Sequence, residues 1–409
     1  MADVIERFLK YISYDTQSER DSATYPSTLK QKEFAKVLVE ELHGIGVGNA
    51  YMDEFGYVMA SVPANTDTSG IALGLIAHMD TSPDASGVNI RPKIVKNYDG
   101  ADILLNGELG IIMRIEDFPD LSDYVGQDLI VTDGTTLLGA DNKSGVAEII
   151  AAVEQVISDP SIPHGKLCIA FTPDEEVGAG AKYFDVARFG ADLAYTVDGG
   201  KLGEFSYENF NSATSKVEIT GVGIHPGYAK DRMVNACVLG AELQSLLPAF
   251  DAPRYSDGHR GYFHLIRFEG DVHNARLTYN TRDYSLDTLH FRMAMLDQAA
   301  QYINEKYGRE FVKISHTEHY HNMKDIVLRH PEMLEFVQKA MRSTGIEPLE
   351  LPVRGGTDGA ALSFKGLPCP NLCAGCRQTH GIYEFVSIND MYRITDFLVE
   401  LIKEYSGCA

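Results

Sequence analysis

Short apolar runs alternate with amphipathic stretches along the first half of the chain. The stretches 29–46 and 144–158 carry apolar residues at helical spacing, which predicts two helices. Apolar runs that predict strands lie at 57–62, 71–77, 166–173 and 192–197. These runs do not alternate between apolar and polar residues, which is typical of strands covered on both faces. The pattern therefore predicts an α/β domain of three layers with a mixed, mostly parallel sheet.

The pattern changes between residues 208 and 321. Strands are predicted there at 215–221, 262–271, 275–285 and 311–319, and helices at 234–247 and 289–308. Their order, β-α-β-β-α-β, fits a ferredoxin-like α+β module. After residue 321 the helical patterns resemble the first region again. We therefore predict one domain made of residues 1–207 and 322–409, with a second domain, residues 208–321, inserted into it.

The composition sets limits on the partners of the protein. The chain has 409 residues, 44% of them hydrophobic, and its 58 acidic and 36 basic residues give a formal net charge of -22. So negative a surface repels nucleic acids and anionic lipids. The start, "MADVIERFLKYISYDT", indicates an amphipathic helix rather than a signal peptide, and no apolar run approaches the ~20 residues of a membrane span. We expect a cytoplasmic protein that binds neither nucleic acid nor membranes.

Acidic residues and histidines follow the apolar runs. In chain order they are His78, Asp80, Asp141, Asp174, Glu175, Glu176, Asp198 and His380. Two of the runs, 136–140 before Asp141 and 367–374 before His380, are also interpreted as strands. Ligands collect at the carboxyl ends of the strands in open α/β sheets, and carboxylates crowded there cannot all stay ionised without a cation. Mixed histidine and carboxylate ligands suit zinc or a similar divalent ion.

Each of these residues also has a structural interpretation that needs no metal. Asp141 could cap the helix that begins near Ser144, and Asp198 could belong to a plain glycine turn. The run 174–176 could be a solvated turn, and His78 a core histidine. Independent turns have no reason to place an acid or a histidine after nearly every strand, so the recurrence favours a site.

Six motifs, taken in order, resemble those of the co-catalytic di-zinc exopeptidases. They are "AHMDTSPD", "LGADNKSG", "FTPDEEVG", "VDGG", "GVGIHPG" and "RGGTDGAALS". The resemblance runs nearly end to end and is strongest to the bacterial members that act on tripeptides. It implies that the inserted module is the lid domain of this family.

The resemblance also implies roles for the residues of the motifs. His78 and Asp198 would bind one zinc ion, Glu176 and His380 the other, and Asp141 would bridge the two. Asp80 would orient the imidazole of His78, and Glu175 would be the general base. The family also implies a cis peptide bond between Asp141 and Asn142.

The implied activity is that of an aminopeptidase that releases the N-terminal residue of tripeptides. Two ions ~3.5–4 Å apart would share one water molecule and polarise the scissile carbonyl. Alternatives with the same chemistry are a dipeptidase, a carboxypeptidase and an N-acyl amino acid deacylase. A peptide-binding relative without catalysis is a further alternative, but such a protein has no use for Glu175.

Substrate recognition is assigned to four residues of the inserted module and the glycine-rich motif. Arg282 and Arg354 are candidates for binding the C-terminal carboxylate, because arginine binds carboxylates through two parallel hydrogen bonds. His225 and Asn235 would add polar contacts, which the resemblance supports. Surface salt bridges and a turn histidine are the competing interpretations.

Two further clusters are interpreted as structural. "CPNLCAGC" has the spacing of some iron–sulfur sites, but its place near the C-terminus favours small, inert residues at Cys373 and Cys376. These cysteines stand where the family usually has glycine and aromatic residues. The histidines of "SHTEHYHN", His316, His319 and His321, are expected on a solvated strand edge. The inserted sheet also offers an edge at which two subunits could pair as a homodimer.

Overall fold

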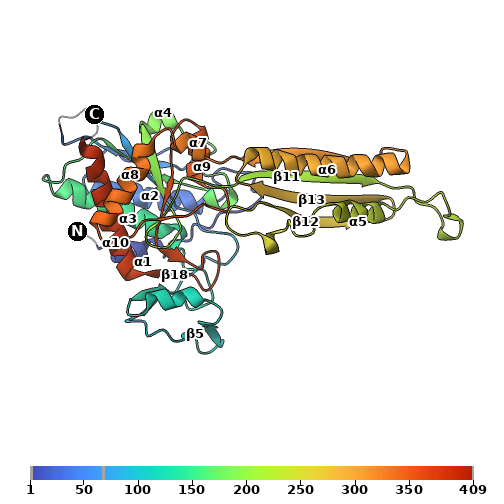
Figure 1. Ribbon diagram of the computed structural model, residues 1–409. Helices are drawn as coiled ribbons and strands as arrows, with labels where there is room; N and C mark the ends of the chain where they lie inside the picture. The colour runs from blue at the N-terminus through green and yellow to red at the C-terminus, as the bar shows by residue number, and fades with distance from the viewer. Residues whose placement is uncertain (1–2, 67–69, 408–409) are drawn as a thin grey trace. The chain divides into compact units, whose positions relative to one another are not determined.

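The computed structural model describes residues 3–66 and 70–407, which divide into two compact units. Unit 1 comprises Met1–Tyr207, Asp325–Leu351 and Thr357–Ala409, and unit 2 comprises Glu208–Lys324 and Pro352–Gly356. Figure 1 shows both units, which are described separately below.

An eight-stranded sheet forms the centre of unit 1. The strands, in their order across the sheet, are β1 (Tyr51–Met52), β2 (Val58–Val62), β8 (Leu167–Thr172), β3 (Leu73–His78), β9 (Leu193–Val197), β16 (Asn371–Leu372), β10 (Glu204–Ser206) and β15 (Leu349–Glu350). The central strands β8, β3, β9 and β16 run parallel, and β1, β2 and β10 contribute antiparallel pairs. The expected mixed, mostly parallel sheet is thereby confirmed.

Helices cover both faces of this sheet, which makes three layers. On one face the core includes residues of α1 (Val4–Tyr11), α2 (Lys30–Gly44), α3 (Ala140–Ser158), α8 (Pro331–Ser343) and α10 (Ile388–Glu404). On the other face it includes residues of the short helices α4 (Val186–Phe189) and α9 (Asp358–Phe364). Along β3, Leu75 and Ala77 face the first core and Ile76 faces the second. All residues of β3, β8 and β9 are buried, which explains why these strands read as unbroken apolar runs.

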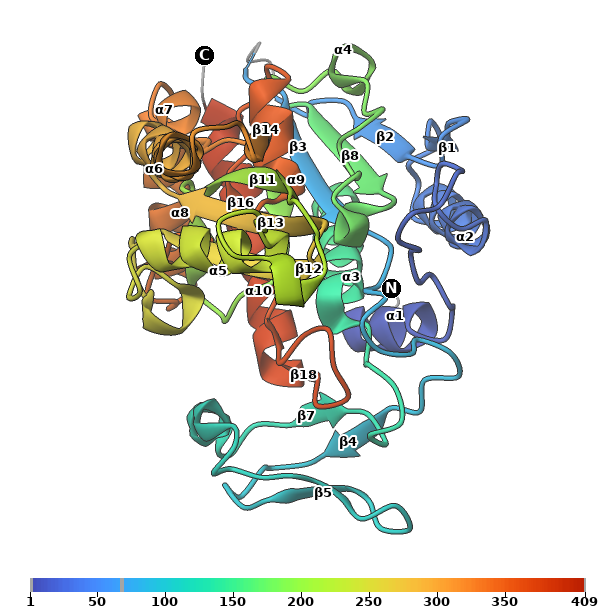
Figure 2. The same cartoon turned by 90° about the vertical axis from the view of Figure 1, so that its right-hand side faces the viewer.

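A smaller part of unit 1 combines the chain between β3 and α3 with two late strands, β17 and β18. A four-stranded sheet has the order β17 (Cys376–Arg377), β18 (Phe385–Ser387), β7 (Leu129–Val131) and β4 (Lys93–Val95). The hairpin β5 (Ile103–Asn106) and β6 (Ile111–Met113) and the 3-10 helix η1 (Pro119–Tyr124) complete it. Figure 2 shows β4, β5 and β7 together with β18. A separate cluster of buried apolar residues, which includes Tyr98 and Phe385, holds this part of unit 1 together.

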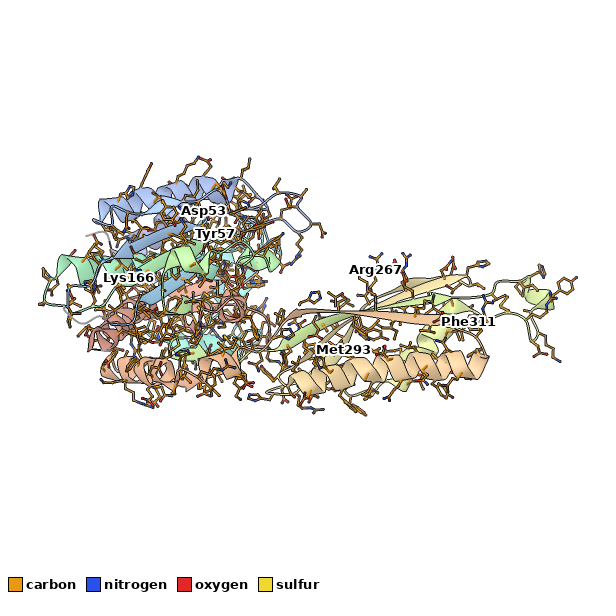
Figure 3. All side chains as sticks on the ribbon, turned by 90° about the horizontal axis from the view of Figure 1, so that it is seen from above. Asp53, Tyr57, Lys166, Arg267, Met293 and Phe311 are labelled. Atoms are coloured by element: carbon orange, nitrogen blue, oxygen red, sulfur yellow. The ribbon has the colours of Figure 1, made fainter. Side chains whose placement is uncertain are left out.

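Unit 2 has the element order expected from the sequence. It contains β11 (Asn211–Thr220), α5 (Ala236–Leu246), β12 (Tyr262–Gly270), β13 (Asn274–Asp283), α6 (Leu286–Tyr307) and β14 (Val312–Tyr320). The strands form an antiparallel sheet in the order β12-β13-β11-β14, which is the ferredoxin-like arrangement. The two helices cover one face, and Figure 3 shows Arg267 of β12 projecting away from α6, the helix that carries Met293.

The two units differ in places from the boundaries expected from the sequence. Residues 322–324 and 352–356 group with unit 2, although the sequence assigned them to the first domain. The segment 352–356 groups there because Val353 forms a parallel β-bridge with Asn209. This segment is too short to show an apolar pattern, so the sequence could not predict that it groups with unit 2. A short helix, α7 (Lys324–Val327), begins at this boundary.

Over residues 3–66 and 70–407, no helix is both long enough and apolar enough to cross a membrane.

Candidate metal centre

Three neighbouring parallel strands deliver candidate ligands to one edge of the main sheet. β3 lies between β8 and β9. His78 is the last residue of β3, and Asp198 comes directly after β9. Glu175 and Glu176 begin the 3-10 helix η2 (Glu175–Val177), shortly after β8 ends. Because the carboxyl ends of parallel strands meet at the same edge, these side chains converge.

Asp141 and His380 reach the site by other routes than the sequence suggested. Residues 136–139 form no strand, and Asp141 lies at the start of α3, where its backbone is not yet helical. His380 lies in the loop between β17 and β18, outside the main sheet. The strand expected at 136–140, before Asp141, was therefore wrong. The run 367–374 does contain a strand of the main sheet, β16, but His380 comes only after the next strand, β17. The peptide bond between Asp141 and Asn142 is cis.

His78, Asp141 and Asp198 form the first group of candidate ligand atoms. Nε2 of His78 lies 3.0 Å from Oδ1 of Asp141 and 3.6 Å from Oδ1 of Asp198. The imidazole of His78 is only 2% exposed. Both carboxylates therefore converge on one buried ring nitrogen.

Asp141, Glu176 and His380 form the second group. Nε2 of His380 lies 3.4 Å from Oδ2 of Asp141 and 3.0 Å from Oε2 of Glu176. Each carboxylate oxygen of Asp141 thus faces a different histidine. The two groups share this one carboxylate, as a bridging ligand requires.

The electrostatics of the two groups favour a bound cation. Burial alone would lower the pKa of His78, but the surrounding carboxylates raise it well above its ordinary value. The carboxylates of Asp141 and Glu176 raise the pKa of His380 to about 11. The carboxylates therefore attract positive charge strongly. Protons on the two imidazoles supply this charge without a metal, and a divalent ion bound to neutral imidazoles would supply it instead.

Glu176 gives a separate indication that the residues fit a metal. Burial raises the pKa of its carboxyl to about 7, and its side chain is only 3% exposed. Its Oε1 is buried and has no hydrogen-bond partner within residues 3–66 and 70–407. A buried, unpartnered carboxylate oxygen beside a histidine is the donor that a metal ion would satisfy.

Asp80 contacts two parts of the site. Its Oδ1 lies 3.4 Å from Nδ1 of His78, on the opposite side of the ring from the first group. Its carboxylate also accepts hydrogen bonds from the backbone N–H of Glu175, at 3.0 Å, and of Glu176, at 3.2 Å. Asp80 therefore joins the end of β3 to the turn after β8. Glu175 itself belongs to neither ligand group, and burial raises the pKa of its carboxyl well above the ordinary value.

The sequence analysis missed Glu384, which is buried in the site. Its Oε2 accepts hydrogen bonds from the N–H of Leu138, at 2.7 Å, and of Gly139, at 2.9 Å, and its Oε1 from that of Asp141, at 2.8 Å. This carboxylate therefore holds the chain segment that carries the shared ligand. Its spacing, four residues after His380, was the only signal in the sequence.

Two further acids near the ligands were also missed. Oδ2 of Asp84 lies 3.4 Å from Nδ1 of His380, so it faces this imidazole much as Asp80 faces that of His78. Asp358 is buried, accepts a hydrogen bond of 2.7 Å from Oγ1 of Thr172, and has its pKa raised to about 7 by burial. No spacing rule connects either acid to a ligand in the sequence, because both contacts depend on the fold.

The four residues assigned to substrate recognition lie in unit 2. Arg282 donates to the carbonyl oxygen of Arg354 at 2.9 Å, so these two meet. The guanidinium of Arg354 donates to Ser256 and Gly258 and lies over the ring of Phe210.

His225 and Asn235 cap short segments of the same unit. Nδ1 of His225 accepts from the N–H of Gly227 at 3.1 Å, and Oδ1 of Asn235 accepts from the N–H of Cys237 at 2.9 Å. Capping is thus one role that both already have. Contact with a substrate stays a prediction for all four residues.

The cysteine cluster forms no group of candidate metal ligands in the described part of the chain. Cys369 lies in one hydrophobic core, and Cys373 and Cys376 lie in another. Burial raises the pKa of Cys373 to about 12, so its thiol stays protonated at neutral pH. The environment is that of inert core residues rather than an iron–sulfur site.

Two histidines of "SHTEHYHN", on the edge strand β14, bond to side chains of the neighbouring strand β11. His316 lies 2.7 Å from Oγ of Ser215, and His319 lies 2.7 Å from Oγ1 of Thr214. Within the described ranges they belong to no group of candidate metal ligands.

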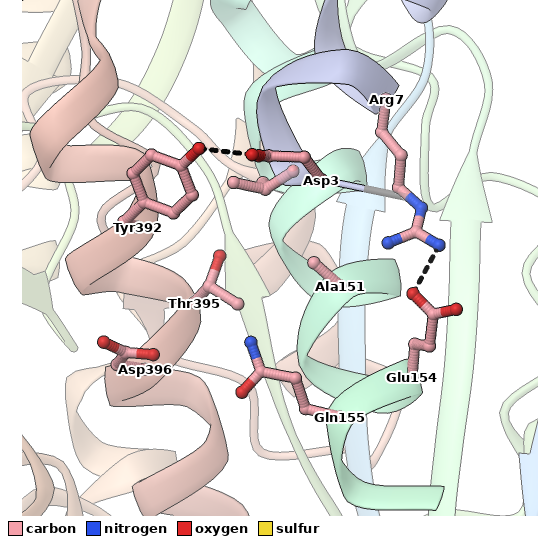
Figure 4. Close-up of a pocket in the computed structure, with 9 residues that line it drawn as sticks. Asp3, Arg7, Ala151, Glu154, Gln155, Tyr392, Thr395 and Asp396 are labelled. Carbon is pink, nitrogen blue, oxygen red and sulfur yellow. Dashed lines mark hydrogen bonds and ion pairs between the residues drawn. The ribbon is translucent and has the colours of Figure 1, made fainter. Parts of the chain in front are cut away.

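A second concave site lies on the surface between α1, α3 and α10 (Figure 4). Its labelled residues are Asp3, Arg7, Ala151, Glu154, Gln155, Tyr392, Thr395 and Asp396. Arg7 pairs with Glu154 at 2.7 Å, and Tyr392 donates to Asp3 at 2.5 Å. These groups satisfy one another, and none of the candidate ligands lines this site.

Comparisons with known proteins agree with this geometry. The profile of "Peptidase family M20/M25/M40" matches residues 133–404. "Peptidase T" of Clostridium acetobutylicum is 48% identical over 406 residues, which are 99% of this chain and 100% of that protein. The crystal structure of aminopeptidase PepT from Bacillus cereus has a TM-score of 0.79 at 23% identity, covering 98% of both chains. A tripeptidase structure from Staphylococcus aureus has a TM-score of 0.78 at 20% identity, with the same coverage.

The fold and the paired ligand groups define a metallopeptidase. The chain belongs to peptidase family M20/M25/M40, because the family profile covers most of its length and a relative at 48% identity matches it almost end to end.

Proposed function

We propose that the protein is a di-zinc aminopeptidase that releases the N-terminal residue from tripeptides. The observation that carries the proposal is the pair of ligand groups that share Asp141, with Glu175 next in the chain to one of the ligands. The relative named "Peptidase T" and the folds described as an aminopeptidase and a tripeptidase support the substrate class.

The residues assigned to the metals match a catalytic zinc pair in number and kind. One ion would be held by His78 and Asp198, the other by Glu176 and His380, and Asp141 would bridge them. Each ion then has three protein ligands, which is usual in catalytic zinc sites. Such a pair would polarise the scissile carbonyl and lower the pKa of the attacking water.

Glu175 is assigned the proton transfers. It would take a proton from the attacking water and return it to the nitrogen of the leaving peptide. Desolvation raises the pKa of its half-buried carboxyl, so it is a stronger base than an exposed glutamate. The hydrogen bond from its N–H to Asp80 fixes its backbone beside His78.

The two charged ends of a tripeptide need separate recognition. Arg282 and Arg354 are proposed to bind the C-terminal carboxylate, because in so acidic a protein (net charge -22) few cations are available for it. His225 and Asn235 are proposed to bind the peptide backbone.

A hydrolysis panel tests the substrate class. The zinc-loaded protein is given di-, tri- and tetrapeptides with free, N-acetylated or C-amidated ends, and the products are identified by mass spectrometry. We expect release of the N-terminal residue, fastest from tripeptides with both ends free, and no release after chelation. Preferred cleavage of dipeptides, of C-terminal residues or of N-acyl amino acids would instead indicate one of the three related activities.

A Glu175→Gln variant tests the mechanism. We expect kcat to fall by roughly 10²–10⁴-fold, because the general base is lost, while the zinc content stays at the wild-type level because Glu175 is not a ligand. An active Glu175→Gln protein would contradict the assignment, and so would a wild-type protein that binds peptides without cleaving them.

A further inference from the structure

The loop that carries His380 is a hairpin connection with unusual backbone geometry. Its strands β17 and β18 pair only at Cys376 with Val386 and at Arg377 with Phe385. Gln378 and His380 both have positive φ, 52° and 66°, a conformation that few non-glycine residues adopt. The side chain of His380 is 43% exposed, against 2% for His78. Burial therefore restrains the side chain of His380 less than that of His78. Contacts elsewhere in the loop must hold His380 in place.

One such contact is made by Asp120 of η1. Its Oδ2 accepts hydrogen bonds from Nη2 of Arg377, at 2.7 Å, and from Nε, at 3.3 Å. Nε2 of Gln378 lies 3.0 Å from Oδ1 and 3.1 Å from Oδ2 of the same carboxylate. Asp120 therefore binds two consecutive side chains at the base of the loop. The Arg377–Asp120 pair is three-quarters buried at both ends, so solvent screens it only in part.

Further contacts come from the same part of the chain, residues 93–131. The ring of Phe118 packs on that of Tyr383, with centroids 5.0 Å apart. Tyr124 packs edge-on against Phe385 at 5.1 Å, and β18 pairs with β7. The segment 93–131 holds none of the five candidate ligands, yet it contacts the hairpin on both sides of His380 in the sequence.

We propose that Asp120 is a positioning residue for the metal site on the His380 side. By binding Arg377 and Gln378, it sets the path of the loop and thus the place of the His380 imidazole relative to Asp141 and Glu176. The segment 93–131 is then a support for one of the two metals. This inference rests on the proposed function, because it presupposes that both ligand groups bind a metal.

The contacts predict an asymmetric effect. Asp80 faces His78, whereas in the described part of the chain the side-chain hydrogen bonds of Asp120 go to Arg377 and Gln378. Loss of the Asp120 carboxylate should therefore weaken the His380 site and leave the His78 site as it is. Loss of a residue that orients a metal ligand typically lowers metal affinity by about 10–100-fold.

The test measures zinc binding to the full-length apoprotein by competition with a chromophoric chelator. An Asp120→Asn variant keeps the size of the side chain but removes its charge. The matched control is Asp102→Asn, which removes an aspartate paired with Arg114 at 3.7 Å in the same segment but away from the hairpin. A His380→Ala variant identifies which binding phase belongs to the His380 side.

We expect wild type and Asp102→Asn to bind two zinc ions with the same pair of affinities. Asp120→Asn should bind one ion normally and the His380-side ion about 10–100-fold more weakly, with kcat recovered at high zinc concentration. If Asp120→Asn does not fold, Arg377→Gln removes the same ion pair from the other end and carries the same expectation.

Two outcomes separate the possible failures. A folded Asp120→Asn protein with wild-type affinity at both sites, even if its melting temperature is lower, would overturn the inference and leave the proposed function intact. A wild-type protein that binds fewer than two zinc ions would overturn the di-zinc proposal itself, and the inference with it.

Discussion

At the scale of single residues, the candidate site depends on buried carboxylates that bind backbone amides. Asp80 accepts hydrogen bonds from the backbone N–H groups of Glu175 and Glu176. Glu384 accepts hydrogen bonds from the backbone N–H groups of Leu138, Gly139 and Asp141. Hydrogen bonds to an ionised acceptor are roughly twice as strong as neutral ones. These two acids therefore fix the backbone of three functional residues, Glu175, Glu176 and Asp141.

A Glu384→Gln variant should weaken the site without removing a ligand. The amide group of glutamine places N–H donors against the N–H groups that now bind Glu384, so at least one donor loses its acceptor. We expect a loss of about 1–3 kcal/mol in the free energy of unfolding and a metal affinity about 10–100-fold lower. Urea unfolding of the apoprotein and a zinc competition titration measure the two effects. Unchanged zinc affinity would show that Glu384 does not position Asp141.

Glu148 gives a prediction about pH. It lies in α3, its side chain is fully buried, and neither carboxylate oxygen has a partner in the described part of the chain. Burial raises its pKa well above the ordinary value. A group whose pKa is raised on folding stabilises the protein below its unfolded pKa, and this contribution is lost as pH rises through the folded pKa.

A Glu148→Met variant should therefore be more stable than wild type at pH 8. The expected gain is about 1–3 kcal/mol, the usual cost of an unsatisfied buried polar group, and it should shrink as the pH is lowered toward 5. Urea unfolding of both proteins with chelator present, at several pH values, measures the difference. A gain that is constant with pH would contradict the assignment of the effect to ionisation.

At the scale of elements, the site depends on a close approach between α3 and β9. Nδ2 of Asn142 donates to the carbonyl oxygen of Val197 at 2.7 Å. A Cβ atom at Gly145 would lie 2.4 Å from that oxygen, which is impossible without movement. Glycine at this position thus lets the start of α3, with Asp141, lie against the end of β9, with Asp198.

A Gly145→Ala variant should push these two elements apart. We expect it to destabilise the protein by about 1–3 kcal/mol, as overpacking does, and to lower affinity for zinc because Asp141 and Asp198 move. Gly44→Ala is the matched control, since a Cβ at this last residue of α2 would meet no atom within 4 Å. Thermal unfolding and zinc titration of both variants test the prediction, and equal behaviour would contradict it.

At the scale of the whole molecule, each of the two units has its own core. The core of unit 2 runs from Val217 to Val312 and packs α5 and α6 on the antiparallel sheet. All five candidate ligands, together with Asp80 and Glu175, belong to unit 1. Metal binding is therefore coupled to the folding of unit 1 and not to that of unit 2.

Removal of the metal should loosen unit 1 selectively. If zinc is present at about 1,000 times its Kd, chelation should lower the free energy of opening by about 4 kcal/mol. We expect faster amide hydrogen exchange in β3, β8 and β9 and unchanged exchange in β11 to β14. Equal acceleration in both units would show that they unfold together, which their separate cores argue against.

The sequence by itself determined the fold class and most of the elements. Unbroken apolar runs predicted the buried strands β3, β8 and β9, because a strand covered on both faces has no polar side. The change of pattern after residue 207 predicted the ferredoxin-like order of unit 2. The recurrence of acids and histidines predicted a site at the edge where three parallel strands end, and the resemblance to the di-zinc exopeptidases implied the individual ligands.

Only the tertiary structure decided how the remaining residues reach the site. Asp141 enters from the start of α3, with no strand before it at 136–140, and His380 enters from a hairpin outside the main sheet that follows β16. Asp120 had no signal in the sequence, and Glu384 had only its spacing from His380, because the partners of both lie more than 240 positions away. Local patterns report which face of an element is buried, whereas contacts between distant segments arise only when the chain is packed.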